Sequence, residues 1–242
     1  MLNLPKLIAH RGGCGYAPEN TLAAMRHAKQ LGARWVEFDV MLSADGQAII
    51  IHDDKVNRTT NGKGKVAELS YQQLSQLDAG SWFSHEFNKE KIPLFSEMIE
   101  CLAETHLSAN VEIKPTPGTA IATTDETMRL IKHSWPASLP LPIVSSFDYA
   151  CIERARELSA DIPLGFLMHR WDSQWLKLSE KLQCVTVHVN HHCLTEKKIQ
   201  AIKASGKLVL AYTVNNAKRA RELFNWGLDA IFTDYPDLKI SE

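Results

Sequence analysis

Eight short apolar segments of strand length recur along the chain, and this repetition limits the folds open to it. They begin near residues 7, 36, 110, 143, 164, 185, 208 and 230, and each of the first seven precedes a helical pattern. Strict strand-then-helix alternation favours a parallel sheet. Eight such units in 242 residues predict a TIM (β/α)₈ barrel. An open doubly wound sheet is the alternative, but no Gly-x-Gly-x-x-Gly motif follows a strand.

The stretch from Trp35 to Asp54 interrupts this alternation, because two apolar runs are joined by only four residues, Ser43-Ala-Asp-Gly46. Four residues are too few for a parallel crossover, so the second run is predicted to return antiparallel as a hairpin. Side chains alternate along a strand, so Glu37 and Asp39 share one face. The return of the chain then brings His52 toward the level of Asp39.

Residues 53 to about 93 form a polar, glycine-containing insert after the second strand. A structureless loop of that length is uncommon in a compact domain, so we predict a small subdomain with its own substructure. We therefore expect residues 1–242 to form a single barrel domain, with the insert as a roof over the site. Trp82 lies in this insert; it either touches the substrate or packs the insert onto the barrel.

Catalytic groups of a TIM barrel lie at the carboxyl ends of its strands, where this chain carries several charged residues. Glu37 and Asp39 lie on the second strand, and Glu112 and Lys114 share a face of the third. Oxygen ligands of this kind suit Mg²⁺ or Ca²⁺ rather than zinc. Structural ion pairs with Arg11 and Lys114 are the alternative, but three acids exceed what two bases neutralise.

Two histidines belong to the same predicted site, and they suggest the chemistry. His10 ends the first strand and His52 ends the hairpin, where they could act as general acid and base. Arg11 and Lys114 are suited to binding phosphate oxygens. An acidic metal site, two histidines and two bases together indicate phosphoryl transfer or phosphodiester hydrolysis.

Other candidate groups are weaker. The pair Ser145-Ser146 lacks the Gly-x-Ser-x-Gly elbow of a nucleophilic serine. His188, His191 and His192 resemble a metal tract, but one lies in a strand and two follow it, so an exposed loop is favoured.

Composition excludes several classes of partner. The formal net charge of −1 gives no basic surplus for nucleic acid. No apolar run approaches the roughly 18 residues of a membrane span, and the N-terminus lacks the pattern of a signal peptide. The five cysteines follow no metal-ligand spacing, so free thiols in a reducing cytoplasm are expected.

Several ordered motifs resemble the signature of the glycerophosphodiester phosphodiesterases. They are His10-Arg-Gly, Pro18-Glu-Asn-Thr21, Glu37-x-Asp39, His52-Asp53 and Glu112-x-Lys114, together with Asp78-Ala-Gly-Ser-Trp82 and Tyr212-Thr-Val-Asn215. The chain is most similar to the cytosolic bacterial enzymes of the glycerol-3-phosphate uptake system. The resemblance implies a TIM barrel with an inserted subdomain. It also implies hydrolysis of glycerophosphodiesters, such as glycerophosphocholine or glycerophosphoethanolamine, to glycerol 3-phosphate and an alcohol.

The same resemblance implies roles for individual residues. Those matching Glu37, Asp39 and Glu112 bind one divalent cation, Mg²⁺ or Ca²⁺. Those matching His10 and His52 act as acid and base, and those matching Arg11 and Lys114 contact the phosphate.

The sequence leaves several questions open. The attacking group is either water or the 2-hydroxyl of the glycerol, which would give a cyclic phosphate as in the related phospholipases C. A lipid-acting, phospholipase D-like enzyme of the same superfamily and a non-catalytic binding barrel are alternative functions. The first is usually secreted and disulfide-bonded, and the second should lack a histidine or a metal ligand. The division of roles between the histidines, the headgroup preference, the metal and the oligomeric state are undetermined.

Overall fold

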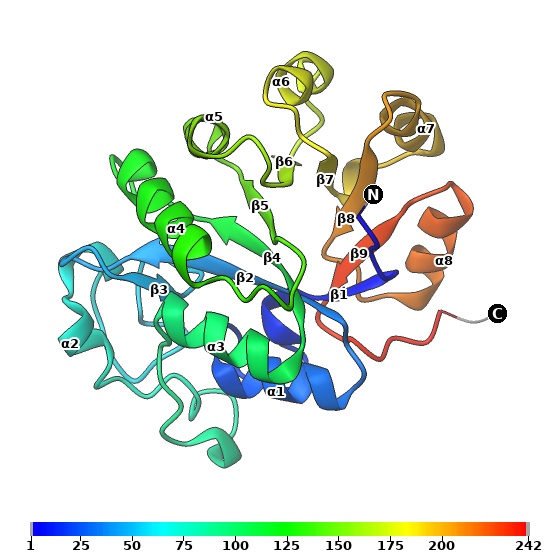
Figure 1. Ribbon diagram of the computed structural model, residues 1–242. Helices are drawn as coiled ribbons and strands as arrows, with labels where there is room; N and C mark the ends of the chain where they lie inside the picture. Colours follow the sequence, from blue (N-terminus) through cyan, green and yellow to red (C-terminus); the bar gives the residue numbers. More distant parts are fainter. Residues whose placement is uncertain (1, 241–242) are drawn as a thin grey trace.

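The computed structural model describes residues 2–240, and within this range a closed parallel barrel forms the centre of the molecule (Figure 1). It closes because the first strand pairs with the last on one side and with the second on the other. Its eight strands are β1 (Leu7–Ala9), β2 (Trp35–Leu42), β4 (Ser108–Ile113), β5 (Ile143–Ser146), β6 (Leu164–Met168), β7 (Thr186–Asn190), β8 (Leu208–Tyr212) and β9 (Ala230–Thr233). The predicted TIM (β/α)₈ barrel is confirmed, and the open sheet is excluded.

Helices surround the barrel and cover the outward faces of its strands (Figure 1). They are α1 (Leu22–Gln30), α3 (Phe95–Thr105), α4 (Ala120–Ser134), α5 (Tyr149–Leu158), α6 (Trp175–Lys181), α7 (Glu196–Ala204) and α8 (Ala217–Asn225). Four begin at a residue whose side chain accepts a hydrogen bond from the first turn: Thr21, Asp148, Thr195 and Asn216. Such caps satisfy backbone donors that have no partner within the helix.

Side-chain alternation divides the core into two regions. Outward residues of the strands, such as Val36 and Phe38 of β2, pack with the helices in the main core. Inward residues form a separate apolar cluster that includes Ile8, Trp35 and Phe232. Glu37 and Asp39 follow Trp35 on the same face, so these acidic side chains also point into the barrel, beyond the inward apolar cluster along β2. This layering places the charged groups at the carboxyl ends of the strands.

The predicted hairpin is present. Strand β3 (Ala48–Ile50) runs antiparallel to β2, with Val40 opposite Ile50 and Leu42 opposite Ala48. It lies beside the barrel sheet and is not one of the eight barrel strands.

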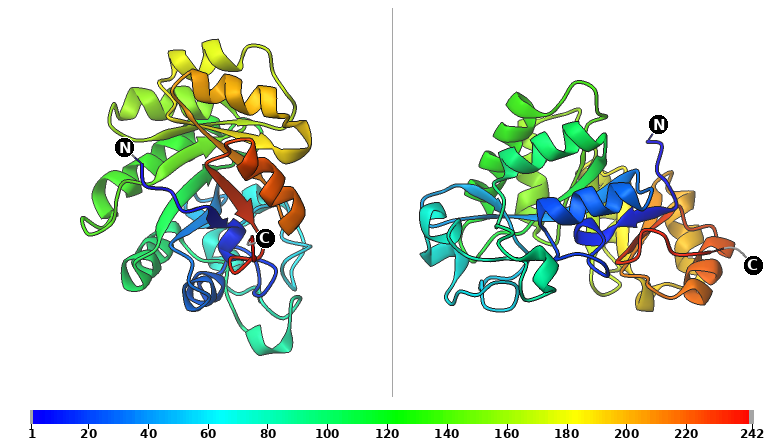
Figure 2. Two further views of the ribbon diagram at one scale, coloured as in Figure 1. Left: turned by 90° about the vertical axis from the view of Figure 1, so that its right-hand side faces the viewer. Right: turned by 90° about the horizontal axis from the view of Figure 1, so that it is seen from below.

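The insert has a small core of its own beside this hairpin. Its buried residues Val56, Val66, Leu74 and Ile92 pack against Met41, Ile49 and Ile51 of the hairpin. The short elements of the insert are η2 (Val66–Glu68), α2 (Tyr71–Leu74) and η3 (His85–Phe87). The views of Figure 2 show the insert projecting from one side of the barrel. Within residues 2–240, no helix is both long and apolar enough to cross a bilayer.

Candidate active site

A cavity of about 300 Å³ opens at the carboxyl ends of the barrel strands. It contains six of the eight residues proposed from the sequence: His10, Arg11, Glu37, Asp39, His52 and Glu112. The rest of its lining is Asn110, Phe147, Leu167, His169, His188, Tyr212, Thr213 and Phe232. Lys114 lies at the edge, where it lines an adjoining hollow that Glu112 and Phe147 also line.

Three carboxylates meet in this cavity. Asp39 of β2 is paired in register with Glu112 of β4, and Glu37 precedes Asp39 on the same face. One carboxylate oxygen of each lies within 4.8 Å of the others, a spacing that could hold a metal ion. Glu112 Oε1 is buried and has no hydrogen-bond partner among the described residues. A buried oxygen without a partner, beside two further carboxylates, fits the ligand set of a hard divalent cation.

The charges of these carboxylates are not balanced by the protein. Burial raises the pKa of Glu37 well above its usual range, and the charges of Asp39 and Glu112 add to this effect. Burial and Asp39 also raise the pKa of Glu112 to about 8. Burial would raise the pKa of Asp39 too, but Arg11 and other cations nearby outweigh it and lower that pKa. The raised pKa values of Glu37 and Glu112 indicate that the protein alone does not stabilise the charged form of all three carboxylates, whereas a bound divalent cation would.

Asn20 orients one of these carboxylates. Its side-chain amide donates to Asp39 Oδ2 at 2.9 Å, and the backbone N–H of Asp39 donates to Asn20 Oδ1 at 3.3 Å. The backbone of Asn20 is left-handed, with φ of 61°, a conformation that asparagine tolerates better than most residues. Thr21, the next residue, caps α1. Sequence reasoning did not assign Asn20 to the site, because the contact joins two separate elements.

Arg11 contacts the carboxylates through both its backbone and its side chain. Its backbone is left-handed, with φ of 50°, and its N–H donates to Glu37 Oε2 at 2.9 Å. Its guanidinium donates from one terminal nitrogen to Glu19 at 2.8 Å. Its Nε lies 3.6 Å from Asp39 Oδ2 and has no hydrogen-bond partner within residues 2–240. A buried donor at the cavity wall can donate a hydrogen bond to a substrate oxygen. Lys114 Nζ is 3.9 Å from Asp39 Oδ1, on the adjoining side.

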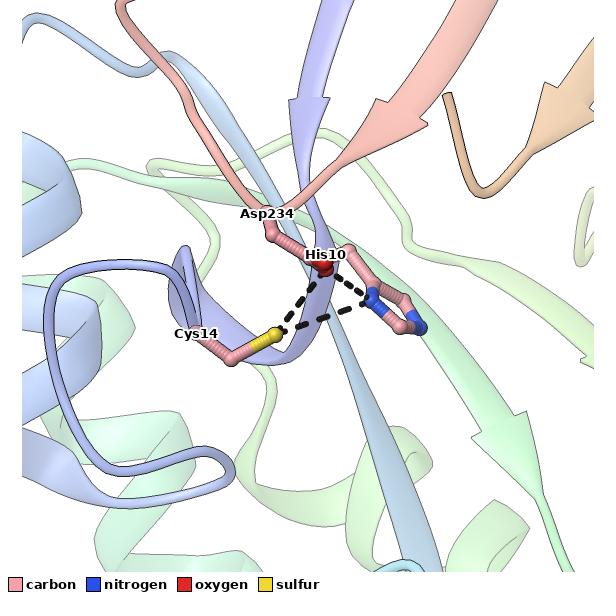
Figure 3. A group of neighbouring side chains, drawn as sticks. All are labelled: His10, Cys14 and Asp234. Carbon is pink, nitrogen blue, oxygen red and sulfur yellow. Dashed lines mark hydrogen bonds and ion pairs between the residues drawn. The ribbon is translucent and has the colours of Figure 1, made fainter. Parts of the chain in front are cut away.

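His10 belongs to a small cluster that joins the first and last strands (Figure 3). Its Nδ1 lies 2.7 Å from Asp234 Oδ1, and the Cys14 thiol donates to the same oxygen at 3.0 Å. Burial opposes the ionisation of Asp234, but the hydrogen bonds with His10, Cys14 and Asn215 and the charge of His10 together outweigh it and lower the pKa to about 2. His10, Cys14 and Asp234 could by distance hold a metal. However, burial raises the pKa of Cys14, so the thiol stays protonated and serves as a donor.

His52 is held in the same way by its neighbour. Its Nδ1 lies 2.7 Å from Asp53 Oδ1. Burial lowers the pKa of His52, although the charge of Asp39 works in the opposite direction. His10 and His52 thus both present Nδ1 to a carboxylate, which leaves Nε2 of each ring for other partners.

The insert does not cover this cavity. No residue between 53 and 93 lines it in the part of the chain that the structure describes, so the predicted roof is wrong. The indole N–H of Trp82 donates to the carbonyl of Ala79, and its ring packs edge-on against Phe83. These contacts of Trp82 lie within the insert and not between the insert and the barrel, and its contact with substrate stays a prediction. The apolar side of the insert is occupied by the hairpin, which holds the insert beside the barrel.

The three histidines near residue 190 lie in two different environments, because His188 belongs to β7 and the other two follow this strand. His192 is exposed, but His188 is buried inside the barrel, where Nε2 lies 2.8 Å from Thr186 Oγ1. Burial lowers the pKa of His188 to about 3. His188 lies in β7, so its predicted place in a strand is confirmed, and its side chain lines the cavity.

The barrel, with polar groups at the carboxyl ends of its strands, defines the chain as a TIM-barrel protein with its candidate active site in the usual place. Residues 10–238 match the model of the Glycerophosphoryl diester phosphodiesterase family. The chain belongs to this family, and the resemblance seen in its motifs is confirmed. It is accordingly an enzyme of glycerophosphodiester phosphodiesterase type.

Two curated relatives and one solved structure illustrate the likeness. The chain is 32% identical to a glycerophosphodiester phosphodiesterase of Bacillus altitudinis, over 99% of both chains. It is 30% identical to one of Bacillus subtilis, over 96% of this chain and 84% of that protein. An Oleispira antarctica phosphodiesterase, solved in complex with the product sn-glycerol-3-phosphate, superposes with a TM-score of 0.94 at 41% identity, covering 97% of this chain and 94% of that one.

Proposed function

We propose that the chain hydrolyses glycerophosphodiesters, such as glycerophosphocholine or glycerophosphoethanolamine, to sn-glycerol 3-phosphate and an alcohol. The observation that carries this proposal is the meeting of three carboxylates and two histidines in one cavity. The glycerol-3-phosphate product in the similar Oleispira antarctica enzyme supports the same class of substrate.

We propose that Glu37, Asp39 and Glu112 hold one divalent cation, Mg²⁺ or Ca²⁺. When bound, such a cation supplies charge neutralisation at the phosphoryl oxygens. The unpartnered oxygen of Glu112 and the uncompensated charge of the cluster support this assignment. Arg11 and Lys114 bind the phosphate from two sides, and the free Nε of Arg11 supports its part.

The two histidines divide the proton transfers between them. One accepts a proton from the attacking hydroxyl, and the other donates a proton to the leaving alcohol. Support comes from the carboxylate at Nδ1 of each ring, which holds the Nδ1 proton, so that Nε2 accepts a proton in the neutral ring and donates one in the imidazolium. The attacking hydroxyl is that of water or the 2-hydroxyl of the substrate, and the second route gives a cyclic phosphate. Phosphorus NMR of the reaction mixture distinguishes them.

A substrate panel tests the function. Purified protein should release sn-glycerol 3-phosphate from glycerophosphocholine, and EDTA should lower kcat by roughly 100-fold or more. Preference for intact phospholipids would favour the lipid-acting alternative, and no turnover of any diester would favour a binding barrel. Full activity after metal removal would contradict the cation site.

The variants Glu112→Gln and His52→Ala, compared with wild type for Mg²⁺ binding and turnover, separate the metal role from the acid–base role. The cytoplasmic location expected from the sequence stays a prediction, which cell fractionation tests.

A further inference from the structure

Arg58 of the insert joins two carboxylates that come from different parts of the chain. Its guanidinium donates to both oxygens of Glu19, each at 2.7 Å, and to Asp53 Oδ2 and Oδ1 at 2.7 and 3.0 Å. Glu19 lies in the loop between β1 and α1, and Asp53 follows the hairpin. The planar fork of arginine suits such paired contacts, which the single ammonium of lysine cannot reproduce.

Each of these carboxylates also holds a residue of the candidate active site. Glu19 Oε1 accepts from the guanidinium of Arg11 at 2.8 Å. Asp53 Oδ1 accepts from Nδ1 of His52 at 2.7 Å. Arg58 is therefore the middle member of a continuous chain of hydrogen bonds, which runs from Arg11 through Glu19, Arg58 and Asp53 to His52. Arg58 itself does not line the cavity.

We propose that Arg58 is a positioning residue that sets the imidazole of His52 relative to the guanidinium of Arg11. The inference rests on the proposed roles of His52 in proton transfer and of Arg11 in phosphate binding. The insert thus acts on the site through the contacts of Arg58 with Glu19 and Asp53, and not by covering the cavity.

The electrostatics of the network agree with this role. The hydrogen bond from Arg58 is the main cause of the lowered pKa of Asp53. Burial would raise the pKa of Glu19, but the hydrogen bond from Arg58 and the charge of Arg11 lower it. Both carboxylates are therefore ionised, as acceptors for Arg11 and His52 must be. The side chain of Arg58 is 45% exposed, so its ion pairs add little to stability and their main effect is geometric.

Chemical rescue tests the proposal. Arg58→Ala should lower kcat for glycerophosphocholine by about 10- to 100-fold, because displaced supporting groups typically cost this much. Millimolar guanidinium should restore part of the loss by occupying the vacated place between the two carboxylates, whereas equal concentrations of ammonium or sodium should not. Arg58→Lys keeps a positive charge without the fork, so its kcat should stay close to that of Arg58→Ala. If Arg58→Ala does not fold, the kcat of Arg58→Lys tests the proposal in its place.

Arg154 provides a matched control. Its guanidinium also bridges two carboxylates, Asp125 at 2.7 Å and Glu157 at 3.0 Å, but on the outer helices α4 and α5. Arg154→Ala should keep the wild-type kcat and show no response to guanidinium. A double-mutant cycle between Arg58→Ala and Asp53→Asn should be strongly non-additive, since both act through His52.

The outcomes separate this inference from the proposed function. Wild-type turnover in Arg58→Ala, or a loss that guanidinium does not reverse, overturns the positioning role. If either result is found while His52→Ala is inactive in the same assay, only the positioning role of Arg58 fails and the proposed function stands. If the wild-type enzyme releases no glycerol 3-phosphate, or if His52→Ala is fully active, the proposed function itself fails.

Discussion

Nδ1 of His10 lies 2.7 Å from Oδ1 of Asp234, although 224 positions separate the two residues. Closure of the barrel brings them together, because β1 pairs with β9 and Ala9 is in register with Thr233. His52 has the same arrangement with the adjacent residue, Asp53, at the same distance. One histidine is thus oriented by local sequence and the other by the fold as a whole.

Asp234→Asn should lower kcat for glycerophosphocholine by about 100-fold or more while KM changes little. An amide can donate to Nδ1 and so favour the wrong tautomer of His10, an effect of known size in histidine–aspartate pairs. Steady-state release of glycerol 3-phosphate measures it. Cys14→Ala removes the thiol contact but keeps the carboxylate, and should stay near wild type. Equal losses in both variants would mean that general disruption of the cluster is responsible.

Asn20→Gly should weaken divalent-cation binding by about 10- to 100-fold, because Asp39 loses the amide that orients it. Glycine accepts the left-handed backbone at this position without strain. Calorimetric titration with Mg²⁺ or Ca²⁺ checks the prediction. Thr21→Ala is the neighbouring control: it removes the cap of α1 and should cost about 1 kcal/mol of stability with unchanged cation affinity. Unaltered affinity in Asn20→Gly would argue against the role of Asp39 as a ligand.

Arg11→Lys should lower kcat/KM by roughly 100-fold although the charge is kept. Lysine cannot donate to Glu19 and to a phosphate oxygen in the fixed geometry of a guanidinium. Kinetics with glycerophosphocholine and competition by the product measure the effect. Arg26→Lys, at an exposed arginine that is 3.5 Å from Glu104, should leave kcat/KM unchanged. A kcat/KM close to wild type in Arg11→Lys would contradict the proposal that this guanidinium donates to both Glu19 and the phosphate.

His188→Gln should reduce the loss of stability in acid. Burial lowers the pKa of His188 from 6.5 to about 3. Above pH 6.5 the imidazole is neutral in both states and its titration has no effect on stability. As the pH falls from 6.5 toward 3, the unfolded chain binds a proton that the folded chain does not. The free energy of unfolding therefore falls by up to about 1.4 kcal/mol per pH unit from this group.

Urea unfolding between pH 6.5 and 4 measures this slope, and the difference between wild type and His188→Gln isolates the histidine. Glutamine keeps a polar group that can bond Thr186. His133→Gln, at an exposed histidine of α4, should leave the slope unchanged. Identical slopes for wild type and His188→Gln would show that the folded protein admits the proton.

The outline of the barrel and most of the candidate site could be read from the sequence, because their signals are local. Hydrophobic periodicity marked the strands and helices, and two-residue alternation placed Glu37 beside Asp39. The short turn of the hairpin required an antiparallel return, which β3 confirms. Each of these inferences depends on a few consecutive residues.

The insert shows where local reasoning failed. Its composition indicated a small substructure, which the cluster around Val56 and Leu74 confirms. Its position could not be deduced, because that depends on which surface of the barrel matches its apolar side. The surface proved to be the hairpin, so Trp82 packs within the insert and Arg58 extends to Glu19.

By itself, the sequence determined the fold class and the set of residues from which the site is built, since both follow from the order and type of side chains along the chain. Only the tertiary structure decided their partners: Asp234 for His10, Asn20 for Asp39, and Arg58 between Glu19 and Asp53. The physical reason is that these contacts join segments brought together by barrel closure and by packing of the insert. Their hydrogen bonds depend on distances of a few ångströms that no spacing along the chain records.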